Sequence, residues 1–469
     1  MKKILPIACA IICAGSLLMV SCKKDSFISS VDARLSISAD TLKYDTVFTT
    51  TGSITKSFKI FNDNDQKLRI SRVKLMGGIA SSYKMNVDGV ATTEASNIEI
   101  EANDSIYVFV SVTINPNAAN LPFIVSDSIL INYNGNNRYV QLQAYGQNAN
   151  FLRNRVITGN LVWTNNLPYV ILGSLRIDTT ATLTINPGCR IYSHADAPFI
   201  VDGTLLVNGT KTDSVVFAGD RLDPDYKDLP ASWPGIYYRG MSKNNVMNFT
   251  MIKNAYQAVV IEKPSVNASP KLIIHQSIID NAYDAGLLCV NTSVQVDNSL
   301  VSNCGSNIVL SYGGTYNFTH VTNAAFSSNY FFHKSPALIV TNYTFINGAT
   351  VSADLNAVFR NCIIWGDAGF VDNEVSVIKQ GASVFNVLFE KNLYRSLADP
   401  ANSTLSGNIR NQEPGFDSVD VSRHYFDFHT TKNALSPGIN VGVVTSFPKD
   451  LDNKTRNVGG PDLGCYEKQ

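Results

Sequence analysis

The densest group of residues that could do chemistry in this chain is an acidic segment spanning residues 220–228. Its four carboxylates are Asp220, Asp223, Asp225 and Asp228. Carboxylate oxygens are ligands that Ca²⁺ prefers, so a calcium site is one interpretation. Arg221 and Lys227 lie within the same segment, and their charges offset what a cation would need. We therefore favour an ion-paired surface loop that Tyr226 and Trp233 pin to the domain, with calcium as the weaker alternative.

The other acidic residues and the histidines show no spacing that supports catalysis. Four further aspartates without a repeated register are Asp280, Asp284, Asp297 and Asp354. The six histidines, which lack metal-ligand spacing, are His194, His275, His320, His333, His424 and His429. His424 and His429 stand among aromatic residues, so we expect them to pack against rings. The sequence predicts no catalytic residue and no cofactor beyond the weak calcium candidate.

The eight cysteines argue against both a disulfide framework and a zinc site. Cys9, Cys13 and Cys22 belong to the N-terminal segment. The remaining five are Cys189, Cys289, Cys304, Cys362 and Cys465. Their odd number and the lack of a CxxC pair predict buried free thiols, with one adventitious disulfide as the alternative.

Charge and composition limit the functional classes. The formal net charge is zero, and charged residues make up 16% of the chain, against about 25% in ordinary domains. A chain without excess positive charge lacks the means to hold nucleic-acid phosphates, so we expect no nucleic-acid partner.

The N-terminus predicts a cellular location. Lys2 and Lys3 precede an apolar run over residues 4–20, which is too short and interrupted for a comfortable membrane span. The run ends in Leu18-Met-Val-Ser-Cys22, which resembles the lipobox of bacterial lipoproteins. That resemblance implies a signal peptide over 1–22, lipidation of Cys22 and a tether over 23–33. The expected location is the envelope of a Gram-negative bacterium, anchored by lipid in the outer membrane.

Residues 34–150 are expected to form an immunoglobulin-like β-sandwich. Short segments such as Ser57-Phe-Lys-Ile-Phe61 alternate apolar and polar residues, and Asn134-Gly135 is a hairpin signal between residues 128–133 and 139–144. The alternating segments are similar to those of Hydin-type immunoglobulin-like modules.

Residues 151–469 carry an internal repeat. The segment Ile171-Leu-Gly-Ser-Leu175 recurs 30 residues later as Val201-Asp-Gly-Thr-Leu205. Short segments that begin with an apolar residue and end in asparagine recur at Asn254, Asn281, Asn303, Asn323 and Asn347. Periods of 20–30 residues with an asparagine at a bend indicate a solenoid. We expect a right-handed parallel β-helix with an equivalent Asn hydrogen-bonded one coil away, and inward aliphatics such as Ile279.

The C-terminal part carries a more specific resemblance. Gly219-Asp-Arg-Leu-Asp223, Trp233-Pro-Gly-Ile236 and Ser436-Pro-Gly-Ile-Asn440 resemble segments of bacterial β-helix lipoproteins of the pectate lyase-like superfamily. The ending Pro461-Asp-Leu-Gly-Cys-Tyr-Glu467 resembles the choice-of-anchor Q group, with Cys465 in place of the usual alanine. The resemblance implies the fold and the envelope location. It also suggests a tail that caps the last coil.

The predicted function is non-catalytic contact with a glycan or a surface. Aromatic residues are frequent in the middle coils, at Tyr312, Tyr316, Phe318, Tyr330, Phe331, Phe332 and Trp365. We expect about two-thirds of them to fill the core or cover strand edges and the rest to face a ligand. The alternative is a polysaccharide lyase or glycoside hydrolase on the same scaffold.

Overall fold

The computed structural model describes residues 26–49, 52–116, 123–367, 370–430, 432 and 435–469. Cys22 and the residues predicted to form a signal peptide lie outside the described residues. The chain divides into two compact units, Met1–Asn148 and Ala149–Gln469. Within the described part, the structure contains no helix with the length and apolar character needed to span a bilayer.

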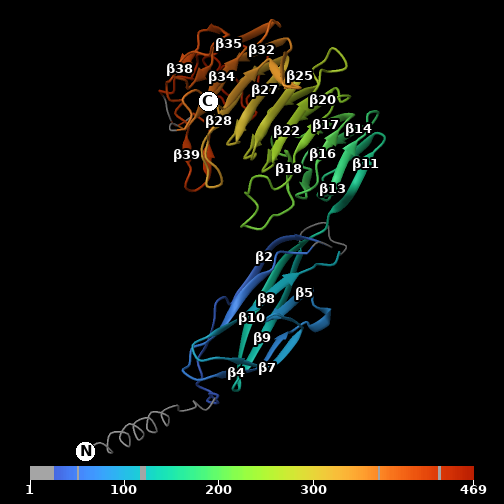
Figure 1. The fold of residues 1–469 in the computed structure, drawn as a ribbon, viewed down its shortest axis with the longest axis vertical. Coiled ribbons are helices and arrows are strands. Elements are labelled where there is room, and N and C mark those ends of the chain that lie inside the picture. The colour runs from blue at the N-terminus through green and yellow to red at the C-terminus, as the bar shows by residue number, and fades with distance from the viewer. Residues whose placement is uncertain (1–25, 50–51, 117–122, 368–369, 431, 433–434) are drawn as a thin grey trace, which may run out of the picture. The chain divides into compact units, whose positions relative to one another are not determined.

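The first unit is an immunoglobulin-like β-sandwich (Figure 1). One sheet has the order β1 (Leu35–Ile37), β3 (Lys56–Asn62), β8 (Ser105–Val112), β5 (Tyr83–Val87) and β6 (Val90–Ala91). The other has the order β2 (Thr41–Phe48), β10 (Asn136–Gln147), β9 (Phe123–Tyr133), β4 (Leu68–Leu75) and β7 (Glu94–Ile100). The short helix η1 (Gly78–Ala80) follows β4. The predicted hairpin is confirmed, because Asn134 and Gly135 join β9 to β10 with φ of 45° and 83°.

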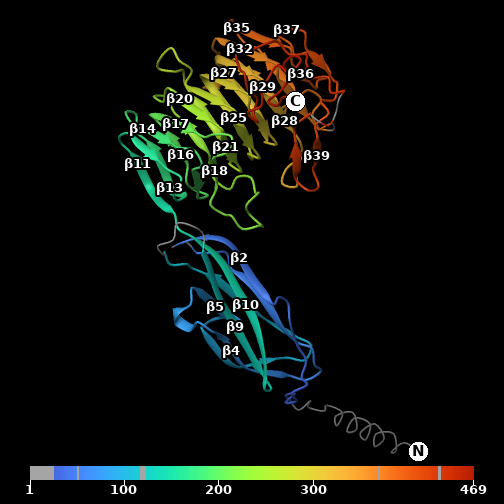
Figure 2. The same cartoon turned by 180° about the vertical axis from the view of Figure 1, so that it is seen from behind.

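The second unit is a parallel β-helix in which 26 strands form one continuous coiled sheet (Figures 1 and 2). Each coil passes through three faces, here named sheets 1, 2 and 3 in chain order. Sheet 1 contains the C-terminal half of β13 (Tyr169–Ile177), β16 (Phe199–Val201), β19 (Ile236–Tyr238), β22 (Gln257–Glu262), the first halves of β25 (Ala285–Asp297) and β27 (Ser306–Thr319), β29 (Leu338–Thr341) and β34 (Val375–Ile378).

Sheets 2 and 3 complete the coils. Sheet 2 contains β12 (Leu161–Trp163), β14 (Thr182–Ile185), β17 (Thr204–Asn208), β20 (Asn245–Asn248), β23 (Leu272–His275), the second halves of β25 and β27, β32 (Leu355–Arg360), β35 (Phe385–Glu390) and β37 (Thr404–Ser406). Sheet 3 contains β11 (Asn150–Ile157), the first half of β13, β15 (Arg190–Ser193), β18 (Val215–Gly219), β21 (Thr250–Lys253), β24 (Ile278–Asp280), β26 (Leu300–Ser302), β28 (Thr322–Ala325), β33 (Ile363–Gly366), β36 (Leu393–Tyr394) and β38 (Ile409–Arg410). Two hairpins project from the coils, β30 (Tyr343–Ile346) with β31 (Ala349–Ser352) and β39 (Ser418–Asp420) with β40 (Tyr425–Asp427).

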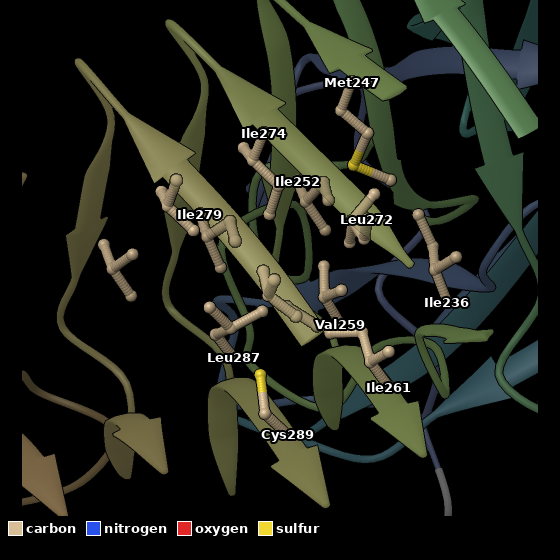
Figure 3. Close-up of a cluster of buried hydrophobic side chains, with 14 of the residues drawn as sticks. Ile236, Met247, Ile252, Val259, Ile261, Leu272, Ile274, Ile279, Leu287 and Cys289 are labelled. Atoms are coloured by element: carbon tan, nitrogen blue, oxygen red, sulfur yellow. The ribbon is translucent and has the colours of Figure 1, made fainter. Parts of the chain in front are cut away.

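Stacked aliphatic side chains fill the inside of the coils (Figure 3). Ile252 and Ile279 are register partners on β21 and β24, and both point into this core. Ile279 is 2% exposed, which confirms its predicted inward position. Because neighbouring coils share one apolar column, no single coil could bury its own face.

The asparagine repeat is partly as predicted. Asn254, Asn281 and Asn303 have positive φ at successive bends, and the Asn281 Nδ2 donates to Asn254 Oδ1 at 2.8 Å. The predictions for Asn323 and Asn347 are wrong. Asn323 lies within β28, where its buried amide donates to Ala337 O, and Asn347 belongs to the β30–β31 hairpin turn. The five cysteines of the second unit are free and buried, as expected.

The C-terminal tail covers the outer face of sheet 3, and the expectation that it caps the last coil is wrong. Leu451, Leu463 and Cys465 of the tail share a buried cluster with Leu300 and Ile363 of sheet 3. Cys465 N donates to Thr322 Oγ1 at 3.0 Å, so the contact falls on middle coils. The outward side chains of these strands are apolar, and the tail removes them from water.

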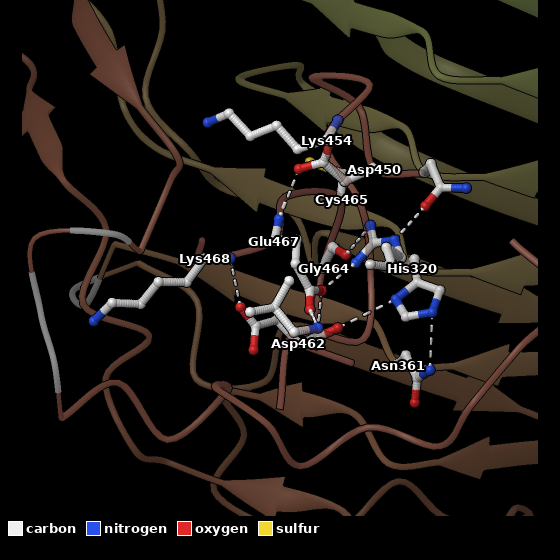
Figure 4. A network of polar contacts seen from close by, with 12 residues as sticks. His320, Asn361, Asp450, Lys454, Asp462, Gly464, Cys465, Glu467 and Lys468 are labelled. Carbon is white, nitrogen blue, oxygen red and sulfur yellow. Dashed lines mark hydrogen bonds and ion pairs between the residues drawn. The ribbon is translucent and has the colours of Figure 1, made fainter. Parts of the chain in front are cut away.

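A buried polar network holds the tail (Figure 4). The Arg456 guanidinium pairs with Glu467 at 3.2 Å, and both side chains are fully buried. Arg456 also donates to Asn298 Oδ1 at 2.7 Å and to Gly464 O at 3.0 Å. His320 lies in the same network beside Asn361, and burial lowers the pKa of its imidazole. The C-terminal segment whose motif was noted in the sequence thus supplies a set of buried partners.

Candidate ligand-binding site

The acidic segment forms an ion-paired loop, in agreement with the favoured interpretation. His194 Nδ1 lies 2.7 Å from Asp220 Oδ2, and Arg221 Nε donates to Asp223 Oδ2 at 3.0 Å. The Arg221 guanidinium stacks 3.8 Å from the centre of the Tyr226 ring. Burial raises the pKa of Asp220, while His194 and Arg221 act in the opposite direction.

Anchors on both sides tie this loop to the coils. Trp233 is 1% exposed and its Nε1 donates to Lys253 O at 2.8 Å. The two stacked bend asparagines donate to the loop, Asn254 to Lys227 O at 2.6 Å and Asn281 to Asp228 O at 2.8 Å. Among the described residues, no three His, Cys, Asp or Glu side chains are grouped so that they could hold a metal ion.

The four scattered aspartates remain apart in space and have separate partners. Asp280 accepts from Ser302 Oγ at 2.7 Å, Asp284 from Gln257 Nε2 at 2.7 Å, and Asp354 from Val384 N at 2.9 Å. Asp297 pairs with His275 at 2.6 Å. His424 packs edge-on against Tyr330 and Phe426, as expected. His429 stacks on Tyr466, but it also bridges Asp427 and Asp452, which the sequence did not suggest.

The aromatic residues of the middle coils divide between core and surface. Tyr316, Phe318 and Trp365 are buried, whereas Tyr330 and Phe332 are exposed. Phe331 and Tyr312 are half-buried. The structure adds two exposed rings that sequence reasoning missed, Tyr256 and Tyr283. We refer to Tyr256, Tyr283, Tyr330, Phe331 and Phe332 as the aromatic rim.

The rim lies at the bend that leads from sheet 3 to sheet 1. The Tyr256 and Tyr283 rings stack with centroids 5.8 Å apart, and Tyr283 meets Phe331 edge-on at 6.2 Å. A repeated tripeptide produces the first two rings, because Asn254-Ala-Tyr256 and Asn281-Ala-Tyr283 occupy the same bend in successive coils. This repeat was the sequence signal that could have located them.

The third copy of the tripeptide replaces the ring and opens a hollow. Asn303-Cys-Gly305 stands where the previous two coils carry tyrosine. A Cβ on Gly305 would lie 2.2 Å from Tyr283 O, so no side chain fits there. The missing ring leaves a pocket of about 480 Å³ between Tyr283 and the loop over residues 328–335.

Polar groups border this pocket. Asp284, Ser306 and Lys334 are among the residues that line it, together with Gly305. The Lys334 ammonium lies 5.8 Å from the centre of the Phe332 ring. Burial raises the pKa of the Tyr330 hydroxyl, and nearby Asp228 raises it further, so this group is a hydrogen-bond donor at neutral pH. Rings, a carboxylate and hydroxyls therefore converge on one hollow.

A buried carboxylate supports the loop that carries half of the rim. Glu374 is fully buried and accepts from His333 Nε2 at 2.9 Å, Ala337 N at 3.1 Å and Arg395 at 3.0 Å. Gly366 leaves the room for it, since a Cβ there would lie 2.2 Å from Glu374 Oε1. The C-terminal end of the loop over residues 328–335 is therefore held to the coils.

Comparisons with known proteins assign no family. No family model matches the chain, and no curated protein matches it. Among solved structures, a family 123 glycoside hydrolase from Clostridium perfringens aligns with 13% identity and a TM-score of 0.20, over 28% of this chain and 30% of that chain. The PapD-like domain 7 of human CEP192 aligns with 7% identity and a TM-score of 0.18, over 25% of this chain and 85% of that domain.

Proposed function

We propose that this protein binds a glycan in the pocket of the aromatic rim. The observation that carries the proposal is the hollow at Gly305, which is walled by Tyr283 and Phe331 and edged by Asp284 and Ser306. Binding sites for small ligands are concave, largely apolar and equipped with a few placed polar groups. The rim has this composition.

The chemistry of the rim suits a sugar. Aromatic faces attract the positively polarised C–H groups of a pyranose ring, in the same way that they attract cations and ring edges. Asp284 and Ser306 can accept or donate hydrogen bonds to ring hydroxyls, and Lys334 can donate. Because Tyr283 is 51% and Phe332 is 58% exposed, both rings have free area to offer.

The second candidate is cleavage of a polysaccharide, and Asp280 is the observation that favours it. Its carboxyl has a pKa raised by burial, with Lys253 and His424 close enough to act in the opposite direction. Lys253 and Asp280 are register partners on neighbouring strands of sheet 3. A perturbed carboxyl beside two basic groups is a signature of acid–base chemistry. Formation of unsaturated or reducing products from acidic polysaccharides, lost in Asp280→Asn, would favour this candidate over pure binding.

The envelope location belongs to the same proposal. Lipidation of Cys22 would hold the two units at a membrane, where a glycan-binding solenoid would meet cell-surface or extracellular polysaccharide. Labelled fatty acid should be incorporated into the full chain and not into Cys22→Ser. Continued labelling of that variant would show that the lipobox interpretation is wrong.

The binding proposal is tested with a glycan array probed by residues 26–469. We expect Tyr283→Ala and Phe332→Ala to reduce the signal of the bound glycans at least about tenfold, because stacked rings contribute roughly 0.5–1.5 kcal/mol each beyond their buried area. Phe345→Ala is the matched control, since Phe345 is 67% exposed on the β30–β31 hairpin. Equal signals from all four proteins would contradict the proposal.

A further inference from the structure

A second hollow lies on sheet 2, between its outward face and the loop over residues 264–270. Its volume is about 520 Å³. The floor is built from the second halves of β25 and β27 and from the start of β32. We refer to it as the sheet 2 groove. Each coil runs from sheet 1 through sheet 2 to sheet 3, and the rim lies at the return from sheet 3 to sheet 1. The groove is therefore on the side of the coils away from the rim.

Strand register arranges the floor as rows of hydroxyls and amides. Ser293, Thr315 and Asn356 are register partners on three successive coils and point outward, as do Gln295 and Asn317. Neighbouring strands are about 4.8 Å apart, so the groove presents the same kind of polar group at a regular interval. Thr315, Asn317 and Asn356 are exposed.

A buried hydroxyl at the groove has no partner. Thr292 borders the groove, is 2% exposed, and its Oγ1 makes no hydrogen bond to any described residue. Next to it, the Tyr316 hydroxyl donates to Gly313 O at 2.8 Å and accepts from Thr292 N, which holds the backbone in place. Thr292 alternates with the outward Ser293 and lies on the same side of the strand as the core residue Val294, so its hydroxyl is enclosed inside the coil and faces away from the groove.

The wall of the groove is a stiff, pinned loop. Pro264 and Pro270 restrict the backbone at its two ends. Asn267 Nδ2 donates to Asn244 Oδ1 at 2.8 Å, and Asn267 Oδ1 accepts from Ser265 Oγ at 3.1 Å. Lys271, just past the loop, is buried, and its ammonium donates to three backbone carbonyls, including Glu262 O at 2.9 Å. Burial lowers the pKa of this ammonium to about 8.

The charge of the lining selects the ligand class. Asp354 is the single carboxylate among the lining residues, which include no lysine or arginine. An acidic chain would meet no cation there and one negative charge. The lining also offers no exposed aromatic ring, because Tyr316 is buried. Recognition must therefore rely on hydrogen bonds to uncharged groups.

We propose that the sheet 2 groove is a second binding site, which takes an uncharged, hydroxyl-rich chain: a neutral polysaccharide. The proposal goes beyond the aromatic rim and does not depend on it. A chain lying along the helix axis would place successive hydroxyls over successive rows of Ser, Thr, Asn and Gln.

The test is affinity electrophoresis in gels that contain mannan, xylan or a soluble β-glucan, with polygalacturonate as the acidic comparison. Thr315→Trp fills the groove and should weaken retardation by a neutral polysaccharide at least tenfold. Thr404→Trp is the matched control, because Thr404 is an exposed outward residue of the same sheet outside the groove. Asn317→Ala serves as a milder second variant if the tryptophan disturbs folding.

Thr292→Val is the control for a change inside the coil. It removes the enclosed, unpaired hydroxyl at nearly constant volume, so stability should stay constant or rise and the binding of neutral polysaccharide should be unchanged. The proposal is overturned if none of the neutral probes binds, if only polygalacturonate binding responds, or if Thr315→Trp binds neutral polysaccharide normally. Loss of binding in Thr315→Trp with normal binding in Tyr283→Ala would support the groove as a site separate from the rim.

Discussion

The outer face of sheet 3 and the aromatic rim adjoin each other on the same coils, but the tail covers the first and leaves the second exposed to solvent. Outward side chains of sheet 3, such as Leu300 and Ile363, are covered by the chain's own tail. The rings of Tyr256, Tyr283 and Phe332 are left open, although they are as apolar as the residues that the tail covers. An apolar surface that stays exposed beside a covered one is a candidate for contact with a ligand or a partner molecule.

The polar groups of the two regions also differ in burial: those under the tail are enclosed, and those at the rim are open to solvent. Under the tail, Arg456 and Glu467 are fully buried, and every described partner is a group of the protein. At the rim, Asp284 and Lys334 stand at the edge of an open pocket. Buried charges must be satisfied internally, whereas charges at a pocket edge can exchange water for a ligand. The tail region is therefore expected to affect stability and the rim to affect binding.

The largest effect is expected from breaking the tail network. Arg456→Met leaves the Glu467 carboxylate buried without its cation, and losses of this kind are about 3–5 kcal/mol. Urea unfolding of residues 26–469 measures it. Lys454→Met is the control, because its ammonium is half-exposed at 3.4 Å from Asp452 and should change stability by less than about 0.5 kcal/mol. Glycan binding by the folded fraction should be the same in both, and a loss specific to Arg456→Met would contradict the division between the regions.

The sequence predicted the coil interior better than its surfaces. Ile279 and the bends at Asn254 and Asn281 follow from periodicity, because a stacked core demands an aliphatic residue and a bend residue in each coil. Asn323 and Asn347 were misplaced because the same short motif fits a strand or a hairpin once coil lengths vary. The Asn-Ala-Tyr repeat is visible in the sequence, and it could have predicted that Tyr256 and Tyr283 occupy equivalent positions after the bends of two successive coils.

The tail and the groove could not be predicted from local patterns. Arg456 meets Asn298 across 158 positions of sequence, and Cys465 meets Thr322 across 143. Such partners are brought together by strand register accumulated over several coils, which no short motif encodes. Likewise, Ser293, Thr315 and Asn356 form one row only because loops of different length separate them.

The second largest effect concerns the rim alone. Tyr283→Ala should weaken binding of a glycan identified on the array about tenfold, while the midpoint of urea unfolding stays nearly constant, since the ring is half-exposed. Calorimetric titration of the same glycan measures the loss. A fall in stability comparable with that of Arg456→Met, without a change in affinity, would mean that the rim is a structural cover like the tail.

A smaller, pH-dependent effect is expected where the tail meets the β39–β40 hairpin. Burial acts to lower the pKa of His429, but Asp452 and Asp427 outweigh it, so the pKa is raised from 6.5. The pKa of Asp452 is lowered from 3.8, because its carboxylate accepts a hydrogen bond from His429 and a further one from Lys211.

The sign of the effect follows from these two shifts. A raised histidine pKa stabilises the fold below 6.5, and this contribution is lost as pH rises through the folded-state value. A lowered aspartate pKa stabilises the fold above 3.8 and is lost as pH falls. The stability difference between the unsubstituted protein and His429→Asn should therefore be largest between pH 4 and 6.5, at about 1 kcal/mol, and smaller at pH 8.5. A difference that grows with pH would contradict the ion-pair geometry.

The smallest effect is expected in the loop over residues 220–228, which borders the rim and tests whether its charges serve structure or a ligand. Asp225 is exposed and Asp223 is held by Arg221 within the loop, so Asp223→Asn with Asp225→Asn should lower stability by no more than about 0.5 kcal/mol. Glycan binding at the rim should be unchanged, since Trp233 and the bend asparagines anchor the loop independently of these carboxylates.

Calcium should not raise the melting temperature of either protein. A calcium site would instead stabilise the unsubstituted protein by about 2.7 kcal/mol at a hundredfold excess over its dissociation constant, and the double variant would abolish the gain. That result would make the loop a metal-binding wall of the rim and would favour polysaccharide cleavage over binding.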